Sequence, residues 1–166
     1  MSTKANYTEE EWTLLLKTPA MAGIAVVTAD ASGPIGVFKE LSAMGKQILA
    51  AGESATTGGL VTELVTDIKA IAERKLPAPK DEKIPAKELK PRLLENLRQA
   101  SALLSAKGSP ADAESYKQWI LDVVTNIARA AKEGTVFGFG GTLVSEAERG
   151  LVREIADVLG LAAPTV

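Results

Sequence analysis

The ten residues Ala20-Met-Ala-Gly-Ile-Ala-Val-Val-Thr-Ala29 decide the fold class of this chain. They are small or apolar on every side, so a helix built from them belongs in the middle of a helical bundle. Ile24, Val26 and Val27 would also suit a buried β-strand. We favour the helix because no other part of the sequence offers a partner strand. The stretch therefore predicts a central helix, against which the rest of the chain packs.

The segments on both sides of this stretch carry the marks of amphipathic helices. Four sites show helix-start signals, two of them capping boxes and two of them a cap residue followed by proline: Thr8–Glu11, Ser145–Glu148, Thr18-Pro19 and Ser109-Pro110. Apolar residues then recur at helical spacing in six segments: residues 12–16, 37–49, 60–71, 89–104, 116–131 and 151–159. Together with the central helix, these patterns predict an all-α bundle of about seven helices. The segment opened by Ser109 is expected to be the longest.

Two connectors interrupt the helical pattern. Residues 51–59 combine glycine, serine and threonine and predict a loop, and the preceding helix is expected to end before them. Residues 76–85 contain three prolines, which predicts an extended, exposed linker. This linker separates two halves, residues 8–75 and 86–160. We expect both halves to belong to a single domain spanning residues 1–166, because 166 residues suit one hydrophobic core better than two.

The composition excludes several classes of function. The chain has no cysteine and no histidine, which rules out a Ser-His-Asp triad, a cysteine nucleophile, a disulfide framework, and zinc or haem sites that need these ligands. Any metal bound by side chains would need oxygen ligands, which favour Ca²⁺, Mg²⁺ or Mn²⁺. The net charge of −2 argues against nucleic-acid binding. The longest apolar run, residues 19–29, is about half of a ~20-residue membrane span, so a cytoplasmic location is the default expectation.

A glycine-rich corner stands out near the C-terminus: Gly134-Thr-Val-Phe-Gly-Phe-Gly-Gly-Thr-Leu-Val-Ser-Glu-Ala-Glu-Arg149. It lacks the spacing and the lysine of a phosphate-binding loop. Phe137 and Phe139 suit either a hydrophobic plug at one end of the bundle or a patch that faces a partner. Trp12 and Trp119 present a similar choice between packing at the edge of the core and anchoring an interface.

Residues 127–161 resemble the C-terminal half of the tellurite-resistance TerB-like family. The resemblance rests on Ile127-Ala-Arg-Ala-Ala-Lys-Glu-Gly134, on the acidic Ser145-Glu-Ala-Glu-Arg149, and on Leu151-Val-Arg-Glu-Ile-Ala-Asp-Val-Leu-Gly160. The family repeats this unit, and residues 22–48, with the turn Asp30-Ala-Ser-Gly33, look like a degraded first copy. The resemblance implies an all-helical fold with an acidic cation site where the two turns meet.

The implied cation site would draw on four carboxylates: Asp30, Glu133, Glu146 and Glu148. The first copy departs from the family pattern, because residues 36–38 replace its paired acids. A site with fewer carboxylates holds Ca²⁺ or Mg²⁺ weakly or not at all. The alternative is that acids in the first turn of a helix interact with the helix dipole.

We expect a non-enzymatic TerB-like helical module with no obligatory cofactor, acting in stress response or tellurite resistance or as an interaction scaffold. Phe137, Phe139 and Trp119 would contact a protein partner or a second copy of the chain in a homodimer. A second hypothesis is a bundle that binds a small apolar ligand in a cavity lined by Met21, Ile24, Met44 and Phe137. A third, an acid–base enzyme using Glu133 and Glu148, has the least support.

Overall fold

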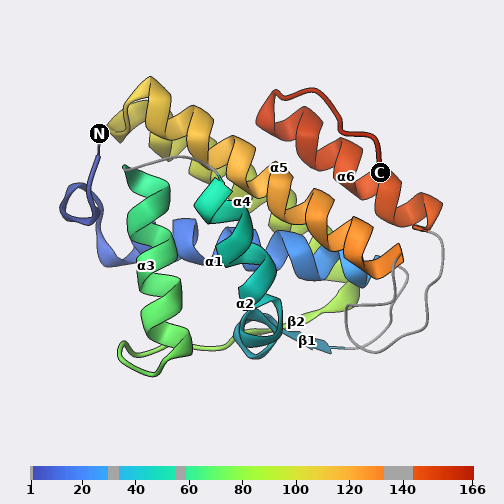
Figure 1. Cartoon of the computed structure of the whole chain (residues 1–166), viewed down its shortest axis with the longest axis horizontal. Helices are drawn as coiled ribbons and strands as arrows, with labels where there is room; N and C mark the ends of the chain where they lie inside the picture. The colour runs from blue at the N-terminus through green and yellow to red at the C-terminus, as the bar shows by residue number, and fades with distance from the viewer. Residues whose placement is uncertain (1, 30–33, 55–58, 133–143) are drawn as a thin grey trace.

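The computed structural model describes residues 2–29, 34–54, 59–132 and 144–166, and the chain in these ranges is mostly helical (Figure 1). The elements are a 3₁₀ turn, six α-helices and two short strands: η1 (Lys4–Asn6), α1 (Glu9–Val27), β1 (Pro34–Gly36), α2 (Val37–Ser54), α3 (Leu60–Ala72), β2 (Lys83–Pro85), α4 (Ala86–Lys107), α5 (Pro110–Lys132) and α6 (Glu146–Leu159). The all-α prediction is confirmed. As expected, α5 is the longest of these helices.

Helix α1 occupies the centre of the bundle, as its composition predicts. It packs against α5, α2 and α4, and more lightly against α6 and α3. Every residue from Thr18 to Val26 is buried. Gly23 allows the neighbouring helices to come close, because a Cβ at this position would lie 2.5 Å from Ile127 Cδ1 and 3.0 Å from Met44 Sδ. The stretch that decided the fold class is therefore a buried helix.

The prediction that Thr18-Pro19 starts a new helix is wrong, because α1 runs through Pro19 without a break. Proline has no N–H, so the carbonyl of Leu15 loses its normal helical donor. The hydroxyl of Tyr116 replaces that donor, with Oη 2.9 Å from Leu15 O. Thr18 Oγ1 also donates to the Leu14 carbonyl at 2.7 Å. Contacts from α5 thus allow one helix where the sequence indicated two.

A second correction concerns the proline-rich linker and the absence of strand partners. Strands β1 and β2 pair antiparallel, with Ile35 opposite Ile84 and Pro34 opposite Pro85. Ile84 is 1% exposed and belongs to the core. The end of the linker is therefore fastened to the body of the protein, while residues 76–82 have no regular structure and are mostly exposed, as predicted.

The expected loop at residues 51–59 begins later than predicted, because α2 continues to Ser54. Gly52 permits a close approach to α3: a Cβ there would lie 2.3 Å from Val65 Cγ2.

Helix α3 ends at Ala72 and is followed by Arg74 in a left-handed conformation, with φ of 60°.

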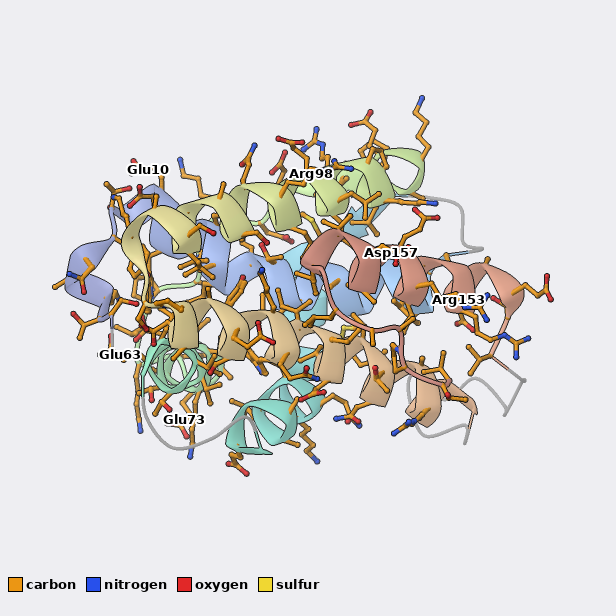
Figure 2. The ribbon with its side chains drawn as sticks, turned by 90° about the horizontal axis from the view of Figure 1, so that it is seen from above. Glu10, Glu63, Glu73, Arg98, Arg153 and Asp157 are labelled. Carbon is orange, nitrogen blue, oxygen red and sulfur yellow. The ribbon has the colours of Figure 1, made fainter. Side chains whose placement is uncertain are left out.

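One continuous cluster of buried apolar residues draws on all six α-helices and on β2. It includes side chains from both predicted halves of the chain, since α1 packs against α4, α5 and α6. Charged side chains such as Glu10, Arg98, Arg153 and Asp157 point away from the bundle (Figure 2). None of the helices in the described ranges is both long and apolar enough to cross a lipid bilayer.

Candidate binding site at Trp12

The structure places two of the four predicted cation ligands, both at the start of α6. Glu146 is exposed. Glu148 closes the capping box that the sequence predicted: Ser145 N donates to Glu148 Oε2 at 2.7 Å, and Glu148 N donates to Ser145 Oγ at 3.1 Å. Asp30 and Glu133 lie outside the described residues. Within the described ranges, no three side chains of the types that bind metals come together.

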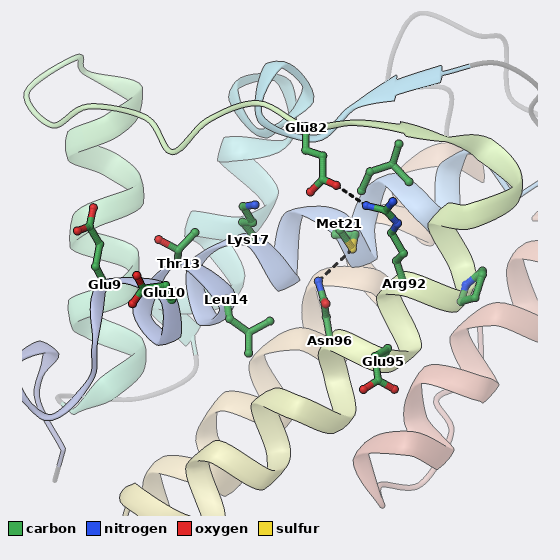
Figure 3. A pocket seen from close by; sticks show the side chains of 12 residues that line it. Glu9, Glu10, Thr13, Leu14, Lys17, Met21, Glu82, Arg92, Glu95 and Asn96 are labelled. Carbon is green, nitrogen blue, oxygen red and sulfur yellow. Dashed lines mark hydrogen bonds and ion pairs between the residues drawn. The ribbon is translucent and has the colours of Figure 1, made fainter.

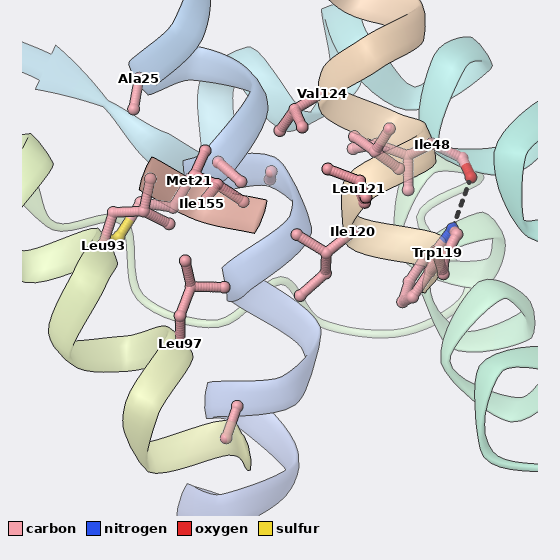
Figure 4. Packing of buried hydrophobic residues seen from close by; sticks show 14 of the residues in the cluster. Met21, Ala25, Ile48, Leu93, Leu97, Trp119, Ile120, Leu121, Val124 and Ile155 are labelled. Carbon is pink, nitrogen blue, oxygen red and sulfur yellow. Dashed lines mark hydrogen bonds between the residues drawn. The ribbon is translucent and has the colours of Figure 1, made fainter. Parts of the chain in front are cut away.

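Of the three predicted interaction residues, Trp119 lies in the core and Phe137 and Phe139 lie outside the described residues. Trp119 is 0% exposed, and its Nε1 donates to the Ile48 carbonyl at 3.1 Å (Figure 4). A side chain that is fully enclosed between α2 and α5 offers no surface to a partner. The interpretation of Trp119 as an interface anchor is therefore corrected to core packing.

The predicted apolar cavity is filled where the structure describes it. Met21, Ile24 and Met44 are 4%, 2% and 2% exposed and belong to the main core. The fourth residue of that prediction, Phe137, lies outside the described residues. The close approach of Met44 and Ile127 to Gly23 leaves no room for a methyl group there. Met21 instead borders a groove that is open to solvent.

The buried ionisable side chains of Asp112 and Tyr116 have structural roles. Asp112 Oδ2 accepts from Ser2 N at 2.7 Å, from Ser2 Oγ at 2.9 Å and from Ser109 Oγ at 2.7 Å. Burial acts to raise the pKa of Asp112, but the hydrogen bonds from Ser109 and Ser2 outweigh it and hold this pKa far below its usual value. Burial raises the pKa of Tyr116 well above that of free tyrosine, so its hydroxyl stays protonated.

A different residue, Trp12, borders a hollow of about 550 Å³ between α1, α3 and the linker. Ligand sites commonly have volumes of about 300–1,000 Å³. The apolar part of its wall combines aromatic, aliphatic and proline side chains: Tyr7, Trp12, Leu16, Ile71, Leu76, Pro77 and Pro79. Leu76 is 37% exposed and is the one large apolar side chain classed as exposed among the described residues. Tyr7, Trp12 and Leu16 are 9%, 5% and 3% exposed, so the apolar surface that the hollow offers comes mainly from Leu76 and the linker.

The polar part of this hollow holds an ammonium group. Lys4 Nζ lies 2.6 Å from Asp67 Oδ2 and 5.6 Å from the centroid of the Trp12 ring. The indole Nε1 of Trp12 donates to the same carboxylate oxygen at 2.9 Å. Tyr7 packs beside the indole, with ring centroids 5.9 Å apart. A carboxylate and an aromatic ring together are a favourable environment for an organic cation. We call this arrangement of Tyr7, Trp12 and Asp67 the ammonium site.

Local sequence signals position Trp12, the aromatic part of this site. Thr8 Oγ1 accepts from Glu11 N, and Glu11 Oε2 accepts from Thr8 N at 2.8 Å, so the predicted capping box starts α1 and fixes Trp12 in its first turn. The backbone N–H of Lys4 donates to Glu63 Oε2 at 2.6 Å, which ties η1 to α3. Glu63 and Asp67 are four residues apart and therefore share one face of α3.

The sequence points to Trp12 but gives no direct indication of Lys4 or Asp67. Their partners are 55 to 63 residues away along the chain, so no local pattern joins them. One signal was present: Asp67 lies three residues after Leu64 and four before Ile71, which puts a carboxylate at the edge of an apolar helix face.

No protein-family model, no curated protein and no solved structure matches this chain. The class of protein is therefore defined by the structure: an α-helical bundle with a partly apolar surface hollow and an ammonium site. The resemblance to the TerB-like family is an expectation from the quoted motifs alone.

Proposed function

We propose that this chain is a non-enzymatic helical binding module that recognises a protonated amine at the ammonium site. The observation that carries the proposal is the position of Lys4, whose ammonium group lies 2.6 Å from Asp67 Oδ2 and 5.6 Å from the centroid of the Trp12 ring. The site accommodates an alkylammonium group when its occupant is the chain's own lysine. An external amine with a similar alkyl stem would make the same two contacts.

Replacing Lys4 by a ligand costs little free energy. Its side chain is 54% exposed, and exposed ion pairs contribute about 0–1 kcal/mol. An exposed cation–π contact adds about 0.5–1 kcal/mol. The backbone of Lys4 is held separately by Glu63, so the side chain can leave without moving η1.

A ligand also gains contacts that Lys4 does not make along the rest of the wall. Leu76 and Pro77 lie in the linker part of the hollow and offer apolar surface to it. Each 100 Å² of apolar surface that a ligand covers contributes about 2.5 kcal/mol. An amine with an apolar body therefore competes favourably with the internal lysine.

This proposal keeps the non-enzymatic module that the sequence predicts and moves its binding surface to Trp12. The buried carboxyl of Asp112 and the hydroxyl of Tyr116 are engaged in structural hydrogen bonds, which agrees with a binding role. A role in stress response or tellurite resistance and a weak Ca²⁺ or Mg²⁺ site stay predictions of the TerB-like resemblance. A homodimer likewise stays a prediction.

The test is an NMR titration with n-butylammonium, read at the indole N–H signals. The Trp12 signal, assigned with a Trp12→Phe variant, should shift saturably, while that of the fully buried Trp119 should not. Lys4→Gln removes the internal competitor and should tighten binding about two- to fivefold, the equivalent of up to about 1 kcal/mol. Asp67→Asn should weaken binding about tenfold, because the carboxylate is lost.

Two controls separate this site from nonspecific effects. Neutral n-butanol should bind much more weakly than n-butylammonium. Lys87→Gln, which removes an exposed lysine of α4, should leave the titration unchanged. The proposed function is wrong if the Trp12 signal of the Lys4→Gln variant shows no saturable shift up to about 100 mM n-butylammonium. The Kd would then exceed about 100 mM, which is too weak for specific binding.

A further inference from the structure

A second hollow, of about 780 Å³, lies between α1, α4 and the end of the linker with β2 (Figure 3). Glu9 and Thr13 separate it from the hollow at Trp12, and neither Trp12 nor Asp67 lines it. Met21 of α1 and Asn96 of α4 meet in its wall, and their side chains point toward each other. A ligand in this second hollow would therefore bind independently of the ammonium site.

The side-chain amide of Asn96 makes a single weak hydrogen bond to the described part of the chain. Its Nδ2 lies 3.5 Å from Met21 Sδ, and a thioether sulfur is a weak acceptor. The second hydrogen of Nδ2 and the carbonyl oxygen Oδ1 have no partner among the described residues. Asn96 lines the hollow and is half-buried, so these two groups are available to a ligand there.

We propose that the second hollow binds a small neutral carboxamide with an apolar chain, and that Asn96 recognises its amide group. A primary amide carries a carbonyl oxygen beside an N–H group, and the asparagine side chain carries the same two groups. The two amides pair by two parallel hydrogen bonds. Asn96 Nδ2 donates to the ligand's oxygen, and the ligand's nitrogen donates to Asn96 Oδ1. The contact with Met21 uses the other hydrogen of Nδ2 and is kept.

The apolar chain of the ligand would cover apolar side chains of α1 and α4. Met21 and Ile84 line the hollow but are only 4% and 1% exposed, so they offer little area. More area comes from Leu14, which is half-buried, and from Pro91, which is exposed. The gain is proportional to the apolar area that the ligand removes from water. An amide with an aliphatic chain therefore binds more tightly than the amide group alone.

The charges around the hollow favour a neutral ligand. Four carboxylates and two cations line it: Glu9, Glu10, Glu82, Glu95, Lys17 and Arg92. This surplus of carboxylates repels an anion. Glu82 is bound to Arg92 and Glu95 to Arg98, which leaves these two carboxylates little attraction for a further cation. A carboxamide therefore suits the hollow better than the corresponding acid or amine.

The experiment is an NMR titration of protein that is isotope-labelled at its methionine methyl groups. The probes are hexanamide, methyl pentanoate and hexanoate, which have the same number of non-hydrogen atoms, together with n-hexylammonium. Hexanamide should shift the Met21 signal, assigned with Met21→Leu, in a saturable way. The signals of the Met44 methyl group, which is in the core, and of the Trp12 indole should not move.

The four probes differ in the group that they offer to Asn96. Hexanamide should bind about three- to tenfold more tightly than methyl pentanoate, because the ester cannot donate to Oδ1. It should bind about threefold or more tightly than hexanoate, which the surrounding carboxylates repel. It should also bind more tightly than n-hexylammonium, which has no acceptor for Asn96 Nδ2.

Protein variants locate the contacts. Asn96→Leu keeps the size of the side chain but removes both polar groups, so it should abolish the preference for hexanamide over methyl pentanoate. Leu14→Ser should weaken hexanamide about three- to fivefold, because it removes apolar contact area. Gln118→Ala removes an exposed side-chain amide of α5, outside the hollow, and should change neither result.

Three results would overturn this proposal, whatever happens at the ammonium site. The first is the absence of a saturable Met21 shift up to about 50 mM hexanamide, which would put the Kd above about 50 mM. The second is an ester, acid or amine that binds at Met21 as tightly as the amide. The third is an unchanged preference for hexanamide in Asn96→Leu.

Discussion

Two tyrosine–tryptophan pairs in this protein have the same ring separation but differ in what lies beside them. Tyr116 and Trp119 have centroids 5.9 Å apart and are 1% and 0% exposed. Tyr7 and Trp12 also have centroids 5.9 Å apart and are 9% and 5% exposed, but they lie at the edge of the core and border a hollow that is open to solvent. The first pair lies between α1, α2 and α5, and the second lies where η1, α1 and α3 meet.

The difference lies in what each indole N–H binds. Trp119 donates to a backbone carbonyl inside the core, which satisfies the group and leaves no charge to interact with a ligand. Trp12 donates to the Asp67 carboxylate, which also binds an exposed lysine. In our proposal, a carboxylate shared between an indole and an exchangeable cation can bind a ligand, whereas a carbonyl in the same place makes only a packing contact. The pairing of aromatic residues alone does not distinguish the two.

The largest expected effect that tests this comparison is on stability at Trp119. Trp119→Ala should lower the free energy of unfolding by about 3–5 kcal/mol, because it leaves a large cavity in a closed core. Trp12→Ala should cost less, since Trp12 is 5% exposed and the hollow beside it admits water to the space that the indole leaves. Urea unfolding followed by circular dichroism measures both. An equal or larger loss for Trp12→Ala would contradict the distinction between a pair enclosed in the core and a pair at its edge.

The next largest effect is expected on the stability of the Asp112 variant. Asp112 lies on α5 and is linked to Tyr7 through Ser2. Tyr7 Oη donates to Ser2 Oγ, whose own hydrogen goes to Asp112. Asp112→Asn should cost about 2–3 kcal/mol at neutral pH, because buried donors lose a charged acceptor.

The pH dependence of this effect has a definite sign. The pKa of Asp112 is lowered in the folded state, so its contribution to stability is complete above its unfolded pKa of about 3.9 and is lost as the pH falls through the folded value. The stability difference between the natural protein and Asp112→Asn should therefore be constant from about pH 5 to pH 8 and shrink below about pH 4. Urea unfolding across this range tests it; a difference that grows on acidification would refute the assignment.

The smallest expected change in stability tests whether the Tyr116 hydroxyl stabilises α1 where the helix runs through Pro19. Tyr116→Phe removes the hydroxyl that serves the Leu15 carbonyl and should cost about 1–2 kcal/mol. In a Pro19→Ala background the new N–H of residue 19 can bond to Leu15, so the same substitution should cost clearly less. A double-mutant cycle of thermal or urea unfolding measures the coupling. If the two costs are equal, the Tyr116 hydroxyl does not compensate for the proline.

Features that depend on neighbouring residues could be predicted from the sequence. The capping boxes at Thr8 and Ser145 are present because each joins side-chain and backbone groups only three residues apart. The apolar stripes marked the buried faces of α3, α4 and α6. The run Ala20–Ala29 indicated the central helix because it has no polar face to turn toward water.

Features that join distant segments could not be predicted. The sequence did not indicate strands β1 and β2. Each is only three residues long, and its ladder hydrogen bonds come from the other strand. Trp12 and Trp119 both lie on amphipathic helices, so the sequence leaves each of them open to core-edge packing or to an interface. Both indoles are buried, and which of them borders a solvent-filled hollow depends on the elements that pack beside it.

The sequence by itself determined the helical class, most helix starts and the exclusion of chemistry that needs cysteine or histidine, because these follow from residue types and short-range spacing. Only the tertiary structure decided that α1 continues through Pro19 and that Lys4 meets Trp12 and Asp67. Those outcomes require groups from α5, η1 and α3 to meet across 55 to 101 residues of chain, and such contacts exist only once the bundle has packed.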